Sequence, residues 1–295
     1  MIDRKLYLGP LTDNRRWDMV QIRPDDVFVV TPPKCGTTWM QTIVALLFSG
    51  DPDVETELSV KMPWVDVRFR EMTEVAERLS AMSGRRSMKS HTPMDGIPLD
   101  SQAQYICVFR HPLDAHFSYR KHVRNIPMSW FDMWYPEEDL DGVTFRRFLD
   151  GGAEGFDADA MPLAHILQHY KAALAVADRP NVSLFHYADM TRDLAGTFAR
   201  LADLLDISHP PQVFEQLIEA ARFDNMKANA ERFAPSGGKG FMKSDSEFFH
   251  SGTSGKWIGH LNDAEFSAYD AMMDAHLTSE ERAWLEYGDA KRAPS

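Results

Sequence analysis

The sequence predicts an α/β fold, with a central and mostly parallel sheet flanked by helices on both faces. Three short β-rich runs each precede a segment with helical periodicity: 25–30 precedes 37–48, 104–109 precedes 112–123, and 181–187 precedes 194–207. Alternation of this kind implies right-handed crossovers between parallel strands. Ligands in such folds bind beyond the carboxyl ends of the strands, so the residues after each run are the first candidates for function.

The chain is expected to form one domain over residues 1–295. Its residues are 44% hydrophobic and 26% charged, which is typical of a globular protein. The sequence contains no repeat, low-complexity tract or linker that would divide it. The most irregular stretch, 234–255, is rich in Gly and Ser. It is either a flexible surface loop or a lid that orders over a ligand.

Charge and cysteine content restrict the function further. The chain has 32 basic and 44 acidic residues, a net charge of −12, which argues against a broad surface for nucleic acid or anionic lipid. Any anionic ligand must therefore be held by a local cluster of cations. The two cysteines are too few for a disulfide framework, the N-terminus lacks a signal-peptide pattern, and the longest apolar run, 43–48, is too short to span a membrane. We therefore expect a soluble, cytoplasmic protein.

The turn after the first strand has the features of an anion site. In VVTPPKCGTTWM, residues 29–40, the strand ends at Thr31 and a helix begins near Thr37, so the first amides of that helix point beyond the sheet edge. Gly36 allows close approach of the backbone, Lys34 supplies a positive charge, and the two threonines add hydroxyl donors. An ordinary turn with a capping threonine is the alternative. The turn is not a Walker A loop, because there the lysine follows the glycines.

Two further segments carry side chains suited to acid–base chemistry and to phosphate binding. His91, in the segment 88–93, has a side chain that can take a proton near neutral pH. Arg110 follows the run 104–109, and its guanidinium can bind phosphate oxygens in a bidentate way. Taken singly, a histidine such as His91 is more often a surface or core residue, and Arg110 is as compatible with capping a strand end as with binding phosphate.

Taken in order, six segments resemble the motifs of the cytosolic, PAPS-dependent sulfotransferase family. They are PPKCGTTW (32–39), MKSHTP (88–93), VFRHPLDAHFSYRKH (108–122), SLFHYADM (183–190), ARFDNMKAN (221–229) and HSGTSGKW (250–257). The resemblance implies the P-loop-like sulfotransferase fold. It also implies the reaction, an in-line transfer of a sulfuryl group from 3′-phosphoadenosine 5′-phosphosulfate (PAPS) to a hydroxyl or amine, which leaves adenosine 3′,5′-bisphosphate (PAP).

The resemblance also implies roles for single residues. His91 would be the general base on the acceptor, Lys34 would neutralise the leaving 5′-phosphate, and Lys89 would lie close to the transferring group. The residues that would bind the donor are Lys34, Cys35, Gly36, Thr37, Thr38 and Trp39 at the 5′ end, Arg110, Ser118, His250, Ser251 and Gly252 at the 3′-phosphate, and Tyr187, Phe223 and Met226 at the adenine. No metal is expected, because protein cations and amides can stabilise the weakly charged sulfuryl group.

Several positions depart from the family pattern. Cys35 replaces the usual serine and Pro32 the usual tyrosine, and His250 and Ser251 replace an Arg-Lys pair that binds the 3′-phosphate. The loop amides can still donate, and the missing charge has three candidate replacements, Lys239, Lys243 and Lys256. The family's dimerisation pattern is also missing after Trp257, so dimerisation by that route is not expected.

The acceptor pocket is only partly indicated. By resemblance the segment 61–69 lines it, which nominates Trp64 and Val65. The many aromatic and methionine side chains favour a phenol, a hydrophobic alcohol or a lipid-like acceptor over a bare sugar. The segment 126–136 is either a second wall of this pocket or ordinary core.

Two other functions compete with sulfuryl transfer, and one pair of histidines has a spacing that could bind a metal. A P-loop kinase is disfavoured because Lys34 precedes the glycine, whereas a nucleotide-binding module without catalysis is suggested by the lost Arg-Lys pair. His165 and His169, four residues apart, lack a third metal ligand at a convincing spacing, so we expect them on a plain helix surface. Cys35 lacks the arginine that a phosphatase nucleophile needs.

Overall fold

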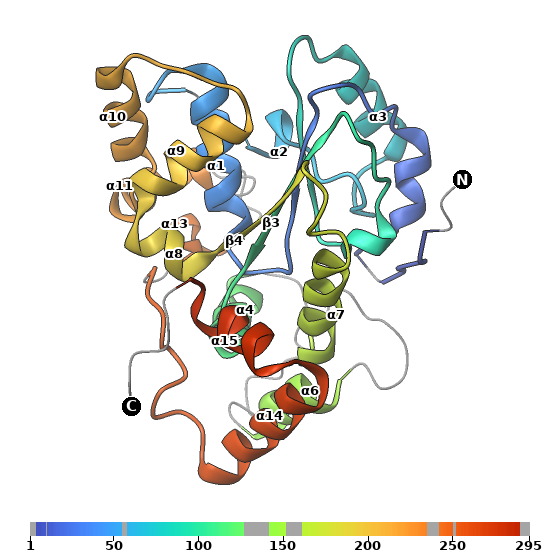
Figure 1. Ribbon diagram of the computed structural model, residues 1–295, viewed down its shortest axis with the longest axis vertical. Helices are drawn as coiled ribbons and strands as arrows, with labels where there is room; N and C mark the ends of the chain where they lie inside the picture. The colour runs from blue at the N-terminus through green and yellow to red at the C-terminus, as the bar shows by residue number, and fades with distance from the viewer. Residues whose placement is uncertain are drawn as a thin grey trace.

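Four parallel strands form the centre of the molecule (Figure 1). A computed structural model describes residues 4–9, 11–54, 58–126, 142–151, 161–234, 242–249 and 252–289. The strands are β1 (Val27–Val30), β2 (Ser87–Ser90), β3 (Gln104–Phe109) and β4 (Val182–His186), in the spatial order β2-β1-β3-β4. The predicted α/β class with a parallel sheet is confirmed. Strand β2 was not predicted, because its sequence SMKS lacks a β-rich apolar run.

The register of the strands brings their carboxyl ends to one edge. Val30 at the end of β1 is paired with Ser90 of β2 and with Cys107 of β3. The Thr31 amide also donates to the Ser90 carbonyl, at 3.2 Å. As a result, the turn after β1, the residues after β2 and the start of the helix after β3 lie side by side.

Helices cover both faces of the sheet (Figure 1). Alternate residues of the strands enter two cores: Val27 and Val29 pack with α1 on one face, and Phe28 and Val30 pack on the other. The first face is covered by α1 (Thr37–Ser49), α9 (Leu194–Leu204) and α10 (Pro211–Ala220). The second is covered by α3 (Met72–Ala81), α4 (Pro112–Arg124), α6 (Gly142–Asp150), α7 (Leu163–Leu174), α14 (Asp263–His276) and α15 (Ser279–Tyr287).

Short helices complete the described part of the chain. They are α2 (Leu58–Lys61), α8 (Tyr187–Arg192), α11 (Phe223–Ala228), α12 (Ala230–Phe233) and α13 (Asp245–Phe248), with 3₁₀ turns at Asn14–Met19 and Met94–Gly96. In the described ranges, no helix has both the length and the apolar character needed to cross a membrane.

The structure describes residues 234, 242–249 and 252–255 of the irregular segment 234–255. Residues 242–249 include α13 and are fixed to the end of α4 by Asn125. The Asn125 side chain donates to the Ser244 carbonyl at 2.7 Å and accepts from the Ser244 amide at 2.9 Å. The predicted contacts of Lys239, His250 and Ser251 lie outside the described residues, as does the segment 127–136.

Candidate active site

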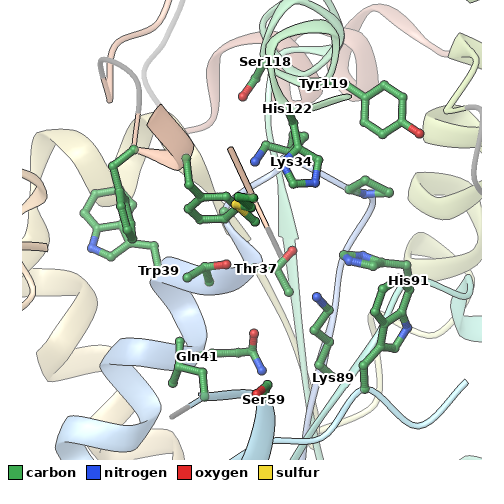
Figure 2. A pocket seen from close by; sticks show the side chains of 18 of the residues that line it. Lys34, Thr37, Trp39, Gln41, Ser59, Lys89, His91, Ser118, Tyr119 and His122 are labelled. Atoms are coloured by element: carbon green, nitrogen blue, oxygen red, sulfur yellow. The ribbon is translucent and has the colours of Figure 1, made fainter. Parts of the chain in front are cut away.

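A cavity of about 380 Å³ lies at the carboxyl edge of the sheet (Figure 2). Its walls come from the turn after β1, from β2 and the residues that follow it, from α4, and from the segments around α11 and α13. Fourteen of the predicted site residues line it: Lys34, Gly36, Thr37, Thr38, Trp39, Trp64, Lys89, His91, Arg110, Ser118, Tyr187, Phe223, Met226 and Gly252. One cavity thus collects residues that lie far apart in the sequence.

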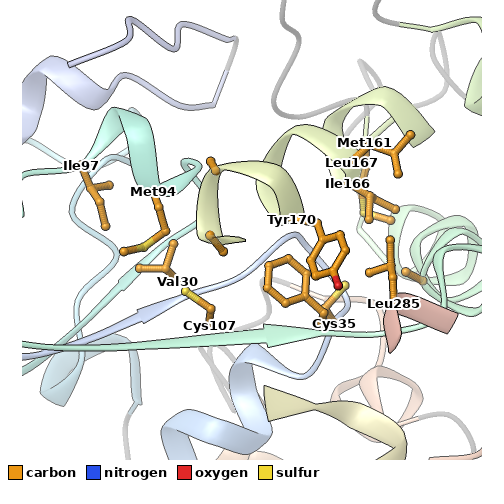
Figure 3. Packing of buried hydrophobic residues seen from close by; sticks show 14 of the residues in the cluster. Val30, Cys35, Met94, Ile97, Cys107, Met161, Ile166, Leu167, Tyr170 and Leu285 are labelled. Carbon is orange, nitrogen blue, oxygen red and sulfur yellow. The ribbon is translucent and has the colours of Figure 1, made fainter. Parts of the chain in front are cut away.

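Two predicted residues do not line this cavity. The Cys35 side chain is fully buried in the core (Figure 3), where burial raises the pKa of its thiol to about 12. Only its backbone therefore belongs to the turn, and the thiol is unsuited to act as a nucleophile. Val65 is also fully buried in this core. The Val65 amide donates to the Lys89 carbonyl at 3.3 Å. Val65 therefore holds the backbone of Lys89 in place and does not itself line the cavity.

The turn after β1 is shaped for an anion. Lys34 has φ 62° and Gly36 has φ 111°, and left-handed residues of this kind occur in turns whose backbone amides bind anions. Gly36 is the N-cap of α1 and has no side chain to cap the helix, so the first amides stay available. A Cβ atom at Gly36 would lie 3.1 Å from the Tyr187 ring. The structure therefore gives a physical reason for the glycine here.

The cations around the cavity destabilise one another. Lys34 Nζ lies 4.0 Å from the centroid of the Phe248 ring, and burial together with the nearby Arg110 and Lys89 lowers the pKa of Lys34 to about 7. Burial also lowers the pKa of Lys89 to about 8. Desolvated cations with depressed pKa values indicate that the site is built to receive an opposite charge.

His91 is held in the form that a general base needs. Its Nδ1 lies 2.7 Å from the Thr31 carbonyl oxygen, and because a carbonyl only accepts, Nδ1 carries the hydrogen. The lone pair is therefore on Nε2. Burial, and then the charge of Lys89, lower the pKa of His91 well below its usual value, so the ring is neutral at pH 7. Trp64 packs edge-on against the ring, with centroids 4.9 Å apart.

Asp66 anchors the residues on both sides of His91. This fully buried carboxylate accepts hydrogen bonds from the Ser90 and Thr92 hydroxyls through one oxygen, each at 2.5 Å. The Thr92 amide also donates to the Ser90 hydroxyl at 3.0 Å. The negative charge of Asp66 raises the pKa of Lys89, against the larger effect of burial. Asp66 thus fixes the backbone that carries both Lys89 and His91.

His169, on α7, holds the segment that carries His91, and this position differs from the one predicted for the histidine pair His165 and His169. His165 and His169 are buried and their rings stack with centroids 4.8 Å apart, so the prediction of a plain helix surface is wrong. His169 Nε2 donates to the His91 carbonyl oxygen at 2.7 Å. Across the described ranges, no cluster of three potential metal ligands occurs.

Arg110 joins the turn after β1 to the loop that begins at Gly252. Its guanidinium lies 4.1 Å from the centroid of the Tyr187 ring and donates to the Thr253 carbonyl at 2.8 Å. Asp114, in the first turn of α4, accepts from the amides of Gly255 at 2.9 Å and Lys256 at 2.7 Å. The loop is therefore fixed against the start of α4.

Lys256 becomes part of the cavity through this loop. Its side chain lines the cavity, and burial, and then Arg110, lower its pKa to about 8. Of the three lysines considered as replacements for the lost Arg-Lys pair, Lys256 lines the cavity, Lys243 does not, and Lys239 lies outside the described residues.

Aromatic rings form an apolar slot at one side of the cavity. The Trp39 and Tyr187 rings meet edge to face with centroids 5.4 Å apart, and Trp39 Nε1 donates to the Ala221 carbonyl at 2.8 Å. Phe223 packs so closely under Gly252 that a Cβ atom there would lie 2.7 Å from the ring. Together with Met226, these side chains can receive a planar base.

Several residues that line the cavity were not predicted from the sequence. His122, Phe248, Gln41 and Ser59 line the cavity without having been predicted. A signal existed for His122, because it lies four residues after Ser118 and therefore one turn further along the same face of α4. The others lie in segments without a motif, so the sequence alone did not single them out.

The fold and the cavity together are those of a nucleotide-binding α/β protein: an anion turn, a neutral histidine and an aromatic slot share one cavity. A family model described as a sulfotransferase domain matches residues 24–280. A glycolipid sulfotransferase of Mycobacterium bovis is 33% identical over 98% of this chain and 96% of its own length. The chain therefore belongs to the sulfotransferase family.

Solved structures agree on the fold. The mouse sulfotransferase SULT7A1, in complex with PAP, superposes with a TM-score of 0.70 at 19% identity, covering 92% of this chain and 90% of its own. Retinol dehydratase with androsterone and PAP superposes with a TM-score of 0.68 at 19% identity, covering 94% and 91%. The predicted family, P-loop-like fold and enzyme class, a sulfotransferase, are confirmed.

Proposed function

We propose that this sulfotransferase moves the sulfuryl group of PAPS to a hydroxyl of a lipid-like acceptor, with His91 as the general base. The observation that carries the proposal is the shared cavity of His91, Lys34 and Lys89, in which the lone pair of His91 is left on Nε2. A neutral imidazole can take a proton from a hydroxyl, while the two lysines, protonated once the anionic donor is bound, stabilise its negative charge.

The donor would lie along the carboxyl edge of the sheet. The 5′-phosphosulfate would bind the first amides of α1, the threonine hydroxyls and Lys34. The 3′-phosphate would bind Arg110, Ser118 and Lys256, with Lys256 supplying the charge that the lost Arg-Lys pair would have given. The adenine would lie in the slot formed by the aromatic rings and Met226.

The chemical step follows from this placement. His91 Nε2 removes the acceptor proton as the acceptor oxygen forms a bond to sulfur, and the bond from sulfur to the 5′-phosphate oxygen breaks. PAP leaves with the electron pair of that bond. Lys34 neutralises the charge that develops on the leaving phosphate, and Lys89 stabilises the sulfuryl oxygens. The proton stays on His91 until the product departs.

The acceptor class rests on the relatives and on the cavity walls. The Mycobacterium bovis relative is named a glycolipid sulfotransferase, and we infer a glycolipid-type acceptor here. An apolar wall suited to such a molecule is formed by Leu58, Met62, Trp64, Val67 and Phe69. We also propose a cytoplasmic location, which the free and buried Cys35 and Cys107 support.

The proposal is tested by transfer of radiolabelled sulfur from PAPS to glycolipid acceptors in detergent. We expect His91→Ala to lower kcat by about 10²–10⁴-fold, the usual contribution of a general base, with little change in PAP affinity. His276→Ala is the matched control, because His276 is exposed at the end of α14. Undiminished turnover of His91→Ala would rule out the assigned base.

A further inference from the structure

The lining of the cavity is rich in cations. Among the residues that the structure describes, no aspartate or glutamate lines the cavity, whereas five lysine and arginine side chains do: Lys34, Arg70, Lys89, Arg110 and Lys256. Like charges that share a partly desolvated space disfavour one another, and an anion placed among them removes this cost. The negative charge that completes the cavity must therefore come from its ligands.

The proposed donor matches four of these five side chains. At neutral pH, PAPS carries about one negative charge on the sulfate, about one on the 5′-phosphate and about 1.5–2 on the 3′-phosphate. In the proposed reaction, Lys34 and Lys89 meet the phosphosulfate, and Arg110 and Lys256 meet the 3′-phosphate. Once these four side chains are protonated, they balance the charge of the donor, and Arg70 is left without an anion.

Arg70 lies at the acceptor end of the cavity. Its Nη1 donates to the Ser59 carbonyl oxygen at 3.2 Å, and Figure 2 shows Ser59 at the end of the cavity away from Ser118, which would bind the 3′-phosphate. Trp64 and Phe69 line the same apolar wall, and their rings meet edge to face with centroids 6.1 Å apart. Arg70 therefore places a positive charge beside the wall that would receive the acceptor.

The Arg70 guanidinium has unused capacity to bind an anion. It can donate several hydrogen bonds, and apart from the bond to Ser59 it makes no hydrogen bond or ion pair with any residue that the structure describes. The nearby carboxylate of Asp66 does not line the cavity, because it is fully buried among other residues. The charge of Arg70 contributes to the lowered pKa of Lys89, so the two side chains act in one part of the cavity.

We propose that Arg70 binds an anionic group of the acceptor, so that the preferred acceptor is an amphiphile that carries a negative charge, such as a carboxylate, in addition to the reacting hydroxyl. This inference rests on the proposed function, because it takes the wall at Trp64 as the acceptor site. A guanidinium binds a carboxylate in a bidentate way. A neutral acceptor of the same shape would displace water from Arg70 without pairing its charge, which is unfavourable.

The test compares two acceptors that differ in one charge, octyl β-D-glucuronide and octyl β-D-glucuronamide, by kcat/KM for transfer from radiolabelled PAPS. We expect the wild-type enzyme to prefer the glucuronide about 10–100-fold, as is usual for a charge-assisted pair. Arg70→Met removes the charge and should lower kcat/KM for the glucuronide to the level of the glucuronamide, with the value for the glucuronamide changed less than about twofold. Arg70→Lys should keep part of the preference, because it keeps the charge and loses the bidentate geometry. Arg68→Met is the matched control, since Arg68 is exposed, does not line the cavity and donates to the Gly9 carbonyl.

A second measurement makes the test independent of turnover. The Kd of each compound for the complex of enzyme and PAP, measured by isothermal titration calorimetry, should show the same preference in the wild type and lose it in Arg70→Met. An unchanged Kd for PAP itself in Arg70→Met shows an intact donor site.

Three outcomes would overturn the inference. They are a wild type without preference for the glucuronide in either measurement, a preference that survives in Arg70→Met, and equal losses for the two compounds in Arg70→Met, which would mean that Arg70 only shapes the wall. Failure of the proposed function shows elsewhere, as undiminished transfer by His91→Ala.

Discussion

Binding of PAP should draw a proton into the site, because Lys34 is largely neutral before the ligand arrives. With a pKa of about 7, Lys34 is mostly unprotonated at pH 8. In the free enzyme, burial and the neighbouring cations disfavour the protonated form of Lys34. The negative charges of the two phosphates of PAP favour this protonated form, so PAP should raise the pKa of Lys34. Lys34 should therefore take up most of a proton on binding at pH 8.

The affinity for PAP should depend on pH with a definite sign. Since the free enzyme holds Lys34 with a lowered pKa and the complex holds it protonated, binding weakens as pH rises above 7. The limit is about tenfold in Kd for each pH unit, which is about 1.4 kcal/mol. Lys89 and Lys256, with pKa values of about 8, extend the same trend to higher pH.

Isothermal titration calorimetry in two buffers of different ionisation enthalpy measures this uptake directly. Lys34→Arg is the control, because an arginine keeps a charge that does not titrate in this range. Phosphate groups also titrate near pH 7, so the quantity of interest is the difference in uptake between the two proteins. Equal uptake by wild type and Lys34→Arg would refute a neutral, desolvated Lys34 in the free enzyme.

Three further predictions follow from the geometry of the site. Asp66→Ala leaves the buried Ser90 and Thr92 hydroxyls without their acceptor, so it should lower the free energy of unfolding by about 2–5 kcal/mol and also lower kcat. Asp66→Asn should keep most of the stability. Equal stability of Asp66→Ala and the wild type in urea unfolding would contradict the anchoring role. Gly36→Ala should raise the Kd for PAP at least tenfold, because φ at this position is 111° and the Tyr187 ring would lie 3.1 Å from the new Cβ. The control is Gly84→Ala, at φ 74° with open space around it, which should lower stability and leave the Kd for PAP unchanged. Similar Kd values for the two variants would contradict a role of the Gly36 turn in binding PAP. Asn125→Ala removes both hydrogen bonds to Ser244, so the Ser244 amide should exchange its hydrogen with solvent faster than in the wild type. An unchanged exchange rate would show that Asn125 does not hold the segment 242–249 in place.

Much of the fold could be predicted because local pattern and burial agree. Strands β1, β3 and β4 and the helices that follow them were predicted from β-rich runs and helical periodicity, and these elements are buried on both faces of the sheet. Strand β2 was missed because Lys89 and two serines interrupt its apolar character. Its pairing with β1 is a tertiary property, and the same pairing places Lys89 and His91 in the cavity.

The direction of single side chains was harder to predict than the position of motifs. Cys35 lies between two residues with left-handed backbone, so its side chain enters the core while its neighbours Lys34 and Gly36 line the cavity. The spacing of His165 and His169 placed them on one face of a helix, and only the packing of α7 shows that this face is buried. A motif therefore located the anion turn, and the fold decided which atoms face the ligand.

A crystal structure of the enzyme with PAP tests the central claim most directly. We expect a 5′-phosphate oxygen within hydrogen-bond distance of Lys34 Nζ and the first amides of α1, the 3′-phosphate against Arg110 and Ser118, and His91 Nε2 facing the 5′ end across open space. A complex in which the 5′-phosphate lies away from Lys34, or in which His91 is separated from it by protein, would contradict the proposed reaction.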